Sequence, residues 1–175
     1  MLSNKRIVIV TIFAVLIGAS VFLNSCRINY SFTGVSLSQQ IKTYSVYYFP
    51  NRAKLVNPTL SQLLTEELKD KLRRKSPLKE VAENGDLVFE GFIEDYEVKS
   101  MSIQKGDAPA QNRLTIKVMV KYTNSVDTGD SFEKSFSGYK DYNSDTNFND
   151  VERDIVPVII DEILEDLFNA TIANW

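Results

Sequence analysis

Cys26 is the only cysteine of the 175-residue chain, and its position points to acylation chemistry. An apolar run over residues 7–23 precedes it, Lys5 and Arg6 precede the run, and Asn24-Ser25 leads into the cysteine. A short basic start, a hydrophobic stretch and small residues at a junction are typical of a bacterial signal peptide. A cysteine at the first mature position predicts a lipoprotein signal, in which the thiol receives a diacylglyceryl group and residues 1–25 are removed. Two alternatives stay open, an uncleaved transmembrane anchor and a buried core cysteine.

Five basic residues are candidates for binding an anion. Arg113, Lys117 and Lys121 fall on one face of a predicted strand, where neighbouring same-face positions are roughly 7 Å apart. Arg52 and Lys54 precede the first predicted helix and form a second candidate pair. Both ammonium and guanidinium groups bind phosphate, the guanidinium in a bidentate way. The alternatives are a solvated outer sheet face for the row of three and a plain polar loop for the pair.

The absence of histidine excludes several classes of site. Serine and cysteine hydrolases of the usual kind need histidine, and typical zinc sites need histidine or further cysteines. Carboxylate-only glycoside hydrolysis remains chemically open. The acidic groups on the predicted helices fit solvated helix faces better; they are Glu66, Glu67, Asp161, Glu162, Glu165 and Asp166. With 7 glycines and no glycine-rich phosphate loop, the sequence predicts no nucleotide cofactor, and no metal.

Charge and cysteine usage narrow the class of protein further. The whole chain has a net charge of −3, and removal of residues 1–25 leaves 18 basic against 23 acidic residues, or −5. Such a chain is a poor generic binder of nucleic acid. A single cysteine also excludes an internal disulfide, so the domain must be held together by its hydrophobic core.

The elements that would position these residues begin after a polar tether over residues 26–40. Residues 41–49 predict a strand, with Tyr44, Val46 and Tyr48 on one face, and Pro50 ends it. Its crowded aromatic residues fit a core better than a binding stripe. Asn57-Pro58 predicts the start of a helix that ends at Ser76-Pro77 and buries a leucine stripe at positions 60, 63, 64, 68 and 72. On this helix, Lys69 and Lys71 serve as the comparison for the basic row, and changing both is expected to leave binding unaffected.

The remaining elements are three strands and a helix. Residues 86–101 predict a strand with a bulge near Glu94-Asp95, residues 102–112 a loop, residues 113–123 a clear alternating strand, and residues 131–139 its hairpin partner. Asn149 and Glu152 predict a capping box for a last helix, in which Pro157 marks a kink or a later true start. The order β-α-β-β-β-α predicts a two-layer α+β domain over residues 41–175, with two helices on a mixed four-stranded sheet. The first strand-helix-strand unit implies a parallel pair.

The order of these segments resembles the LptE family of lipopolysaccharide-assembly lipoproteins. The resemblance rests on YSFTG at 30–34, YYFPNRA at 47–53, NPTLSQLLTEELKDKL at 57–72, GDLVFEGFIEDYEV at 85–98, AQNRLTIKVMVKYTN at 110–124 and the ANW ending. It implies a protein anchored in the inner leaflet of the outer membrane that plugs an LptD β-barrel, helps it fold and binds lipopolysaccharide during transport. Only the acylation site transfers by residue, to Cys26. The five basic candidates would then meet lipid A phosphates.

Two other functions stay open at this stage. One is an auxiliary periplasmic lipoprotein of a lipid transport system that has no barrel partner, and the other is a carboxylate-based hydrolase. The resemblance favours a protein that is not an enzyme. Residues 27–29 carry no acidic cluster that would direct export to the cell surface, so we expect a periplasm-facing location.

Overall fold

The computed structural model describes residues 38, 40–55, 57–101 and 110–173. All of them belong to one of the two units into which the chain divides, Val35–Trp175. Cys26, the predicted signal peptide and most of the predicted tether therefore lie outside the described residues. Among the described residues, no helix is both long enough and apolar enough to span a membrane.

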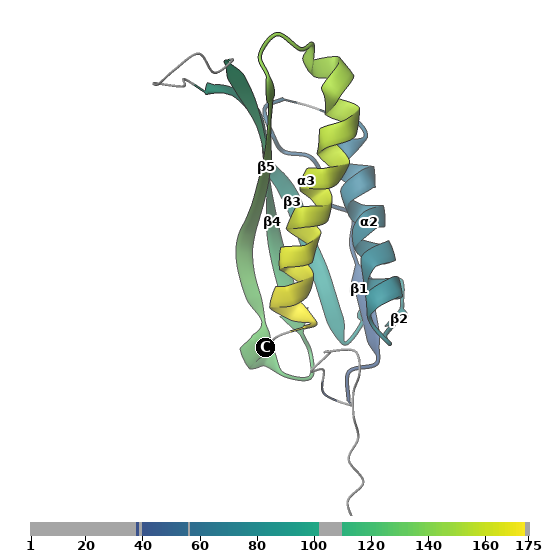
Figure 1. Cartoon of the computed structure of the whole chain (residues 1–175). Coiled ribbons are helices and arrows are strands. Elements are labelled where there is room, and N and C mark those ends of the chain that lie inside the picture. The colour runs from purple at the N-terminus through teal and green to yellow at the C-terminus, as the bar shows by residue number, and fades with distance from the viewer. Residues whose placement is uncertain (1–37, 39, 56, 102–109, 174–175) are drawn as a thin grey trace, which may run out of the picture. The chain divides into compact units, whose positions relative to one another are not determined.

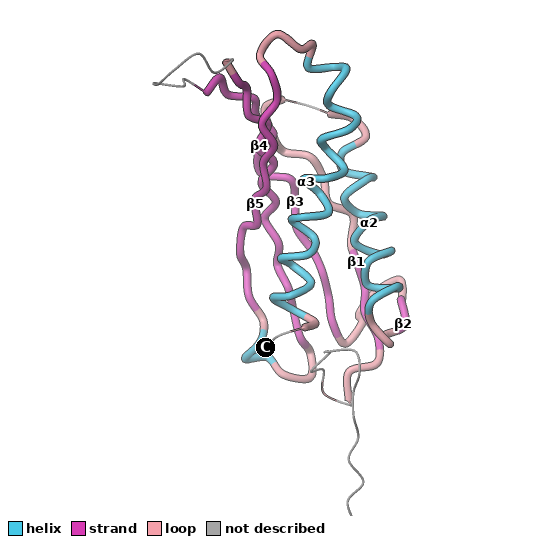
Figure 2. The backbone as a smooth tube through the Cα atoms, viewed as in Figure 1, coloured by secondary structure: helices cyan, strands magenta, loops and turns pink. Residues whose placement is uncertain are grey.

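The described unit is a two-layer α+β domain, as the sequence predicts, with two helices on a mixed sheet. The strands are β1 (Thr43–Val46), β2 (Lys79–Glu80), β3 (Leu87–Met101), β4 (Gln111–Asn124) and β5 (Phe132–Asn143), in the order β2-β1-β3-β4-β5. The helices are α2 (Leu60–Lys75) and α3 (Phe148–Thr171), with a 3₁₀ turn, η1, at Thr128–Asp130. Both α2 and α3 lie on the same side of the sheet (Figures 1 and 2), so no helix of the described residues covers the opposite face.

The predicted four-stranded sheet is wrong by one strand. The fifth strand, β2, is two residues long and pairs in parallel with β1 at Thr43 and Tyr44. Its residues, Lys79 and Glu80, are both exposed, so no hydrophobic alternation marks them as a strand. The predicted parallel pair is confirmed, since β1 also runs parallel to β3.

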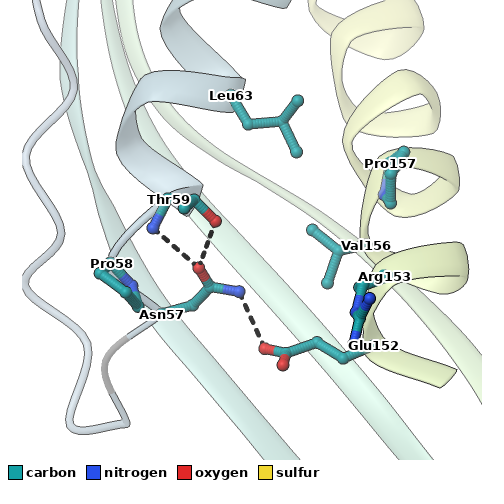
Figure 3. Close-up of a pocket in the computed structure, with 8 residues that line it drawn as sticks. All are labelled: Asn57, Pro58, Thr59, Leu63, Glu152, Arg153, Val156 and Pro157. Carbon is teal, nitrogen blue, oxygen red and sulfur yellow. Dashed lines mark hydrogen bonds between the residues drawn. The ribbon is translucent and has the colours of Figure 1, made fainter. Parts of the chain in front are cut away.

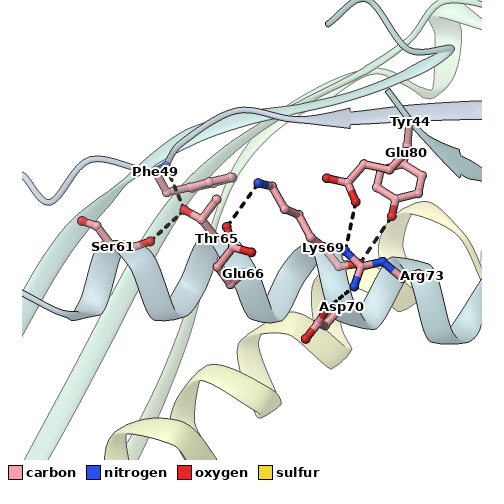
Figure 4. Close-up of polar contacts among 9 residues, drawn as sticks. All are labelled: Tyr44, Phe49, Ser61, Thr65, Glu66, Lys69, Asp70, Arg73 and Glu80. Carbon is pink, nitrogen blue, oxygen red and sulfur yellow. Dashed lines mark hydrogen bonds and ion pairs between the residues drawn. The ribbon is translucent and has the colours of Figure 1, made fainter. Parts of the chain in front are cut away.

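The first strand is shorter than the predicted 41–49. Tyr44 and Val46 are buried, but Tyr48 is 61% exposed and Phe49 is buried in its place. The alternation breaks because the regular strand ends at Val46, and the chain forms a bridge with β3 again only at Asn51, opposite Ile93. The segment is then held to α2 by Thr65, whose hydroxyl donates to the Ser61 carbonyl at 2.7 Å and accepts from the Phe49 N–H at 3.2 Å (Figure 4).

The bulge near Glu94 and Asp95 is confirmed. The pairing of β3 with β4 shifts between Ile93 and Asp95. Before the shift the odd-numbered residues Leu87, Phe89 and Ile93 are buried, and after it Tyr96 is buried. The bulge therefore keeps the apolar face of a long twisted strand on the core.

Strands β4 and β5 form the predicted hairpin, and three of their four ends extend beyond the predicted bounds. The β4 alternation is as expected, with Leu114, Ile116, Val118, Val120 and Tyr122 all buried. Strand β4 starts at Gln111, inside the predicted loop 102–112, and β5 runs to Asn143 instead of residue 139. The β5 extension was missed because charged residues interrupt its apolar pattern.

Helix α2 begins later than the predicted Asn57-Pro58 start. Its N-cap residue is Thr59, and the Asn57 side chain accepts from the Thr59 N–H and hydroxyl, both at 2.9 Å. Asn57 thus organises the turn before the helix. The predicted end is confirmed, since Ser76 is the C-cap. The leucines at 60, 64, 68 and 72 are buried, and Leu63 is partly buried.

Helix α3 begins before the predicted cap. Its N-cap is Asn147, whose side chain accepts from the Asn149 N–H at 3.0 Å, so Asn149 already lies in the first turn. The helix continues through Pro157, and a later true start is wrong. Pro157 is exposed and so is Arg153, four residues earlier, so water can satisfy the carbonyl that the proline leaves without a donor.

Lys71 joins the two helices, although no pattern in the sequence marks it as buried. It is 3% exposed, and its Nζ lies 2.8 Å from both Asp161 Oδ1 and Glu165 Oε2 on α3. Burial opposes the charged form, but hydrogen bonds to these carboxylates outweigh it and raise the pKa of Lys71. Hydrogen bonds from Lys71 and then Lys75 lower the pKa of Glu165. The pattern of polar residues along each helix could not reveal these ion pairs between α2 and α3.

Candidate functional site

The predicted basic row of β4 lies on the sheet face opposite the helices, and every member has an acidic partner on a neighbouring strand. The pairs are Arg113 with Asp141 of β5 at 2.7 Å, Lys117 with Glu94 of β3 at 3.2 Å, and Lys121 with Glu90 of β3 at 2.9 Å. An incoming anion must therefore compete with a carboxylate at each position. The row is a ladder of cross-strand ion pairs more than a free cationic stripe.

Arg113 is the most firmly held of the three. Its Nε and one terminal nitrogen donate to the two oxygens of Asp141, at 2.7 and 2.9 Å, and its guanidinium carbon lies 3.9 Å from the centre of the Tyr139 ring. The bidentate bond lowers the pKa of Asp141. Both the charge and the planar face of this guanidinium are already in contact with other side chains, which makes Arg113 the least available phosphate ligand of the row.

Arg52 and Lys54 are exposed and differently placed. The Arg52 N–H donates to the Ile93 carbonyl at 3.0 Å, and Asn51 Oδ1 accepts from the Ala53 N–H at 2.9 Å, so the backbone here is fixed against β3. The Arg52 guanidinium lies 4.2 Å from the centre of the Phe92 ring. Within the described ranges neither Arg52 nor Lys54 forms an ion pair.

The structure brings Arg52, Lys54 and Lys117 together around one groove of about 570 Å³. Three carboxylates also line it, namely Glu94, Asp95 and Glu97. The Ser135 hydroxyl and then Lys117 hydrogen-bond to Glu94 and lower its pKa, so Glu94 stays ionised against Lys117. We call these nine lining residues the basic-acidic groove; its remaining members are Leu55, Tyr96 and Val98.

The chemistry of the basic-acidic groove suits a ligand with phosphate and apolar parts. Arg52 and Lys54 line it without ion pairs among the described residues. Lys117 is a third cation, which a bound anion would share with Glu94. Leu55, 47% exposed, adds apolar surface beside them. Arg113 and Lys121 do not line this groove, so the structure joins only three of the five predicted residues.

A second hollow, of about 410 Å³, lies between the starts of α2 and α3 (Figure 3). At its floor, Glu152 Oε1 accepts from Asn57 Nδ2 at 2.8 Å and from the Tyr96 hydroxyl. Burial, and then the bond to Glu152, raise the pKa of Tyr96. The sequence assigned Glu152 to a helix cap, and no local pattern could show that it instead ties the turn before α2 to α3 and β3.

The acidic helix groups are mostly occupied by lysines. Glu66 pairs with Lys69 at 3.2 Å, and Glu162 pairs with Lys140 of β5. Asp161 and Glu165 hold Lys71, as described above. In the part of the chain that the structure describes, no three histidine, cysteine, aspartate or glutamate side chains are grouped so that they could hold a metal ion.

Comparison with known proteins gives one family. Residues 41–171 match the model of the family described as LptE, lipopolysaccharide-assembly, which covers the domain from before β1 to the end of α3. No curated protein sequence matches the chain.

Solved structures of similar fold share little sequence with the chain. A hypothetical protein from Chlamydia trachomatis is 12% identical with a TM-score of 0.51, covering 77% of this chain and 99% of that one. A minor lipoprotein from Acinetobacter baumannii is 16% identical with a TM-score of 0.49 over 73% and 90%. The rare lipoprotein B of Shewanella oneidensis is 14% identical with a TM-score of 0.46 over 74% and 90%. At 12% identity, the likeness to the Chlamydia trachomatis protein concerns the fold alone.

Proposed function

The chain belongs to the LptE lipopolysaccharide-assembly family, and we propose that it acts there as an outer-membrane lipoprotein that binds lipopolysaccharide and plugs an LptD-like β-barrel. The observation that carries this proposal is the family match over residues 41–171, since it spans every described helix and strand. In this proposal Cys26 carries the lipid anchor, and the domain faces the periplasm.

Lipopolysaccharide would contact the protein at the basic-acidic groove. Lipid A presents phosphate groups next to acyl chains, and the groove offers Arg52 and Lys54 beside the exposed Leu55. Glu94 and a phosphate would share Lys117, at a cost in binding free energy, because the Lys117–Glu94 ion pair must loosen. Arg113 and Lys121 would serve as outlying contacts on the same sheet face.

The test is lipopolysaccharide binding by a double variant, Arg52→Ala with Lys54→Ala. A charge-assisted contact contributes about 1.5–3 kcal/mol, so the loss of two should weaken binding by about tenfold or more. The variant should keep the stability of the parent to within about 0.5 kcal/mol, because both side chains are exposed. Binding by the parent should also weaken as salt rises.

The matched control is Lys42→Ala with Lys79→Ala, which removes the same charge from two exposed positions outside the groove. It should bind as the parent does. Lys117→Ala with Lys121→Ala should have a smaller effect than the groove variant, since both lysines already have carboxylate partners. Equal binding by the groove variant and the control would reject the basic-acidic groove as the lipid contact.

The alternative is an auxiliary periplasmic lipoprotein of a lipid transport system without a barrel partner. It shares the lipid anchor and the lipid contact with our proposal and differs only in the partner. A barrel that copurifies with the chain from native outer membranes separates the two.

A further inference from the structure

The edge of the sheet formed by β5 has features of a docking site for another strand. The two sheet edges differ in length, since β2 is two residues long and β5 is twelve. Among the described residues, no strand pairs with the outer side of β5. Long unpaired edges are a template for β-strand addition, and proteins usually blunt them.

The register identifies which backbone groups of β5 face outward. The Ser144 N–H donates to the Ala110 carbonyl at 3.0 Å, and the pairing of β4 with β5 continues from there without a shift. Hydrogen-bonded pairs alternate along an antiparallel ladder, so the even-numbered residues of β5 bond to β4. The N–H and C=O groups of Ser137, Tyr139 and Asp141 therefore point to the open edge.

A groove of about 490 Å³ runs along this part of the edge, between residues 137–141 of β5 and the acidic side of α3. Gly138 makes the close approach of α3 possible, because a Cβ there would lie 3.0 Å from Ile159 Cγ2 and 3.2 Å from Ile163 Cγ1. One wall is thus free strand backbone, and the other carries Glu162 and Asp166, which are four residues apart and share a helix face.

The usual protection of an edge by lysine is weak here. The Lys140 side chain is turned to Glu162, and the Lys134 ammonium lies 5.2 Å from the centre of the Phe136 ring. Asp141 is neutralised by Arg113, which leaves Glu162 and Asp166 against the single charge of Lys140. The groove is therefore acidic on its helix side.

We propose that the β5 edge accepts an extended segment of a partner protein as a sixth strand, with lysine or arginine at the positions that face Glu162 and Asp166. The charge pattern disfavours a second copy of this chain, because pairing two β5 edges about a two-fold axis would bring two acidic α3 faces together. This inference uses none of the basic-acidic groove and stands independently of the proposed function.

The test is residue-resolved amide exchange of the full chain with a nine-residue peptide that alternates threonine with lysine. In the free chain, the amides of Ser137, Tyr139 and Asp141 should exchange rapidly, and the peptide should slow them by about tenfold or more. The matched peptide with glutamate in place of lysine should give no protection.

Two variants separate backbone pairing from charge. Ser137→Pro removes an outward N–H without removing a bond to β4, so it should abolish protection, while the control Ser137→Thr should preserve it. Glu162→Gln with Asp166→Asn keeps the fold and should weaken lysine-peptide binding roughly two- to fivefold. This second pair decides the matter if the proline variant does not fold.

Several results would overturn the inference. One is a lack of protection by the lysine peptide, and another is equal protection by both peptides. A third is that these amides are already protected in the free chain, whether by a second copy seen in sedimentation or by another segment of the same chain.

Discussion

At the residue scale, ion pairing determines which cations on the open sheet face remain without a carboxylate partner among the described residues. Arg113 and Arg52 both lie over an aromatic ring, but Arg113 also holds Asp141 with two hydrogen bonds. The sequence correctly predicted that Arg113, Lys117 and Lys121 share a strand face. Their acidic partners could not all be predicted, because Glu94 is the residue that the β3–β4 pairing skips at the bulge, and only the bulge brings it to Lys117.

Cys26 lies outside the described residues, so its acylation rests on the sequence and is tested directly. Replacing Cys26 with alanine should give an unprocessed precursor that incorporates no labelled palmitate, because the thiol is the acceptor. The matched control is Ser25→Gly, which keeps a small residue before the cysteine and should be processed and labelled. Palmitate uptake by the Cys26 variant would contradict the assignment.

At the scale of elements, apolar periodicity predicted what depends on burial and missed what depends on backbone pairing. The β4 alternation and the leucine stripe of α2 could be predicted because both consist of apolar residues that the core buries. Strand β2 was not, since its two exposed charged residues pair only through their backbones. The early start of α3 was also missed, because Asn147 and Asn149 are equally good caps in sequence.

The contact between α2 and α3 gives a stability prediction. Replacing Lys71 with methionine keeps much of the buried stem but removes its hydrogen bonds to Asp161 and Glu165, so we expect a loss of about 1.5 kcal/mol in the free energy of unfolding. The loss is small for hydrogen bonds to charged groups because Asp161 and Glu165 are both exposed enough to be solvated by water once Lys71 is replaced. The control Lys69→Met, in an exposed pair with Glu66, should change stability by less than about 0.5 kcal/mol.

The pH dependence of this difference follows from the two pKa shifts. Glu165 has a lowered pKa in the folded state, so its contribution is complete above about pH 4.3 and is lost as pH falls through the folded value. Lys71 has a raised pKa, so its contribution is complete below about pH 10.4 and is lost as pH rises through the folded value. Urea unfolding across pH should show the largest difference in the free energy of unfolding between the parent and the Lys71→Met variant between these two pH limits. A difference that stays constant into strong acid would argue against a stabilising role for the ion pairs of Lys71 with Asp161 and Glu165.

At the scale of the whole molecule, the family was recognisable from the order of segments, while the two candidate contact surfaces were not. The match over residues 41–171 agrees with the resemblance read from the sequence. The basic-acidic groove joins Arg52, which follows β1, to Lys117 in β4 across the width of β3. The open β5 edge likewise depends on strand order, which local patterns do not fix. Tertiary pairing, and not residue type, creates both candidate surfaces.

The central claim is that this chain works with an outer-membrane β-barrel. Its most direct test is purification of the tagged full chain from native outer membranes in mild detergent, beside an unrelated tagged lipoprotein of the same membrane as the control. Our account predicts that a large LptD-like β-barrel protein copurifies in stoichiometric amount with this chain and not with the control. Recovery of the chain without any barrel, under conditions that keep outer-membrane complexes intact, would contradict the account and favour an auxiliary protein of lipid transport.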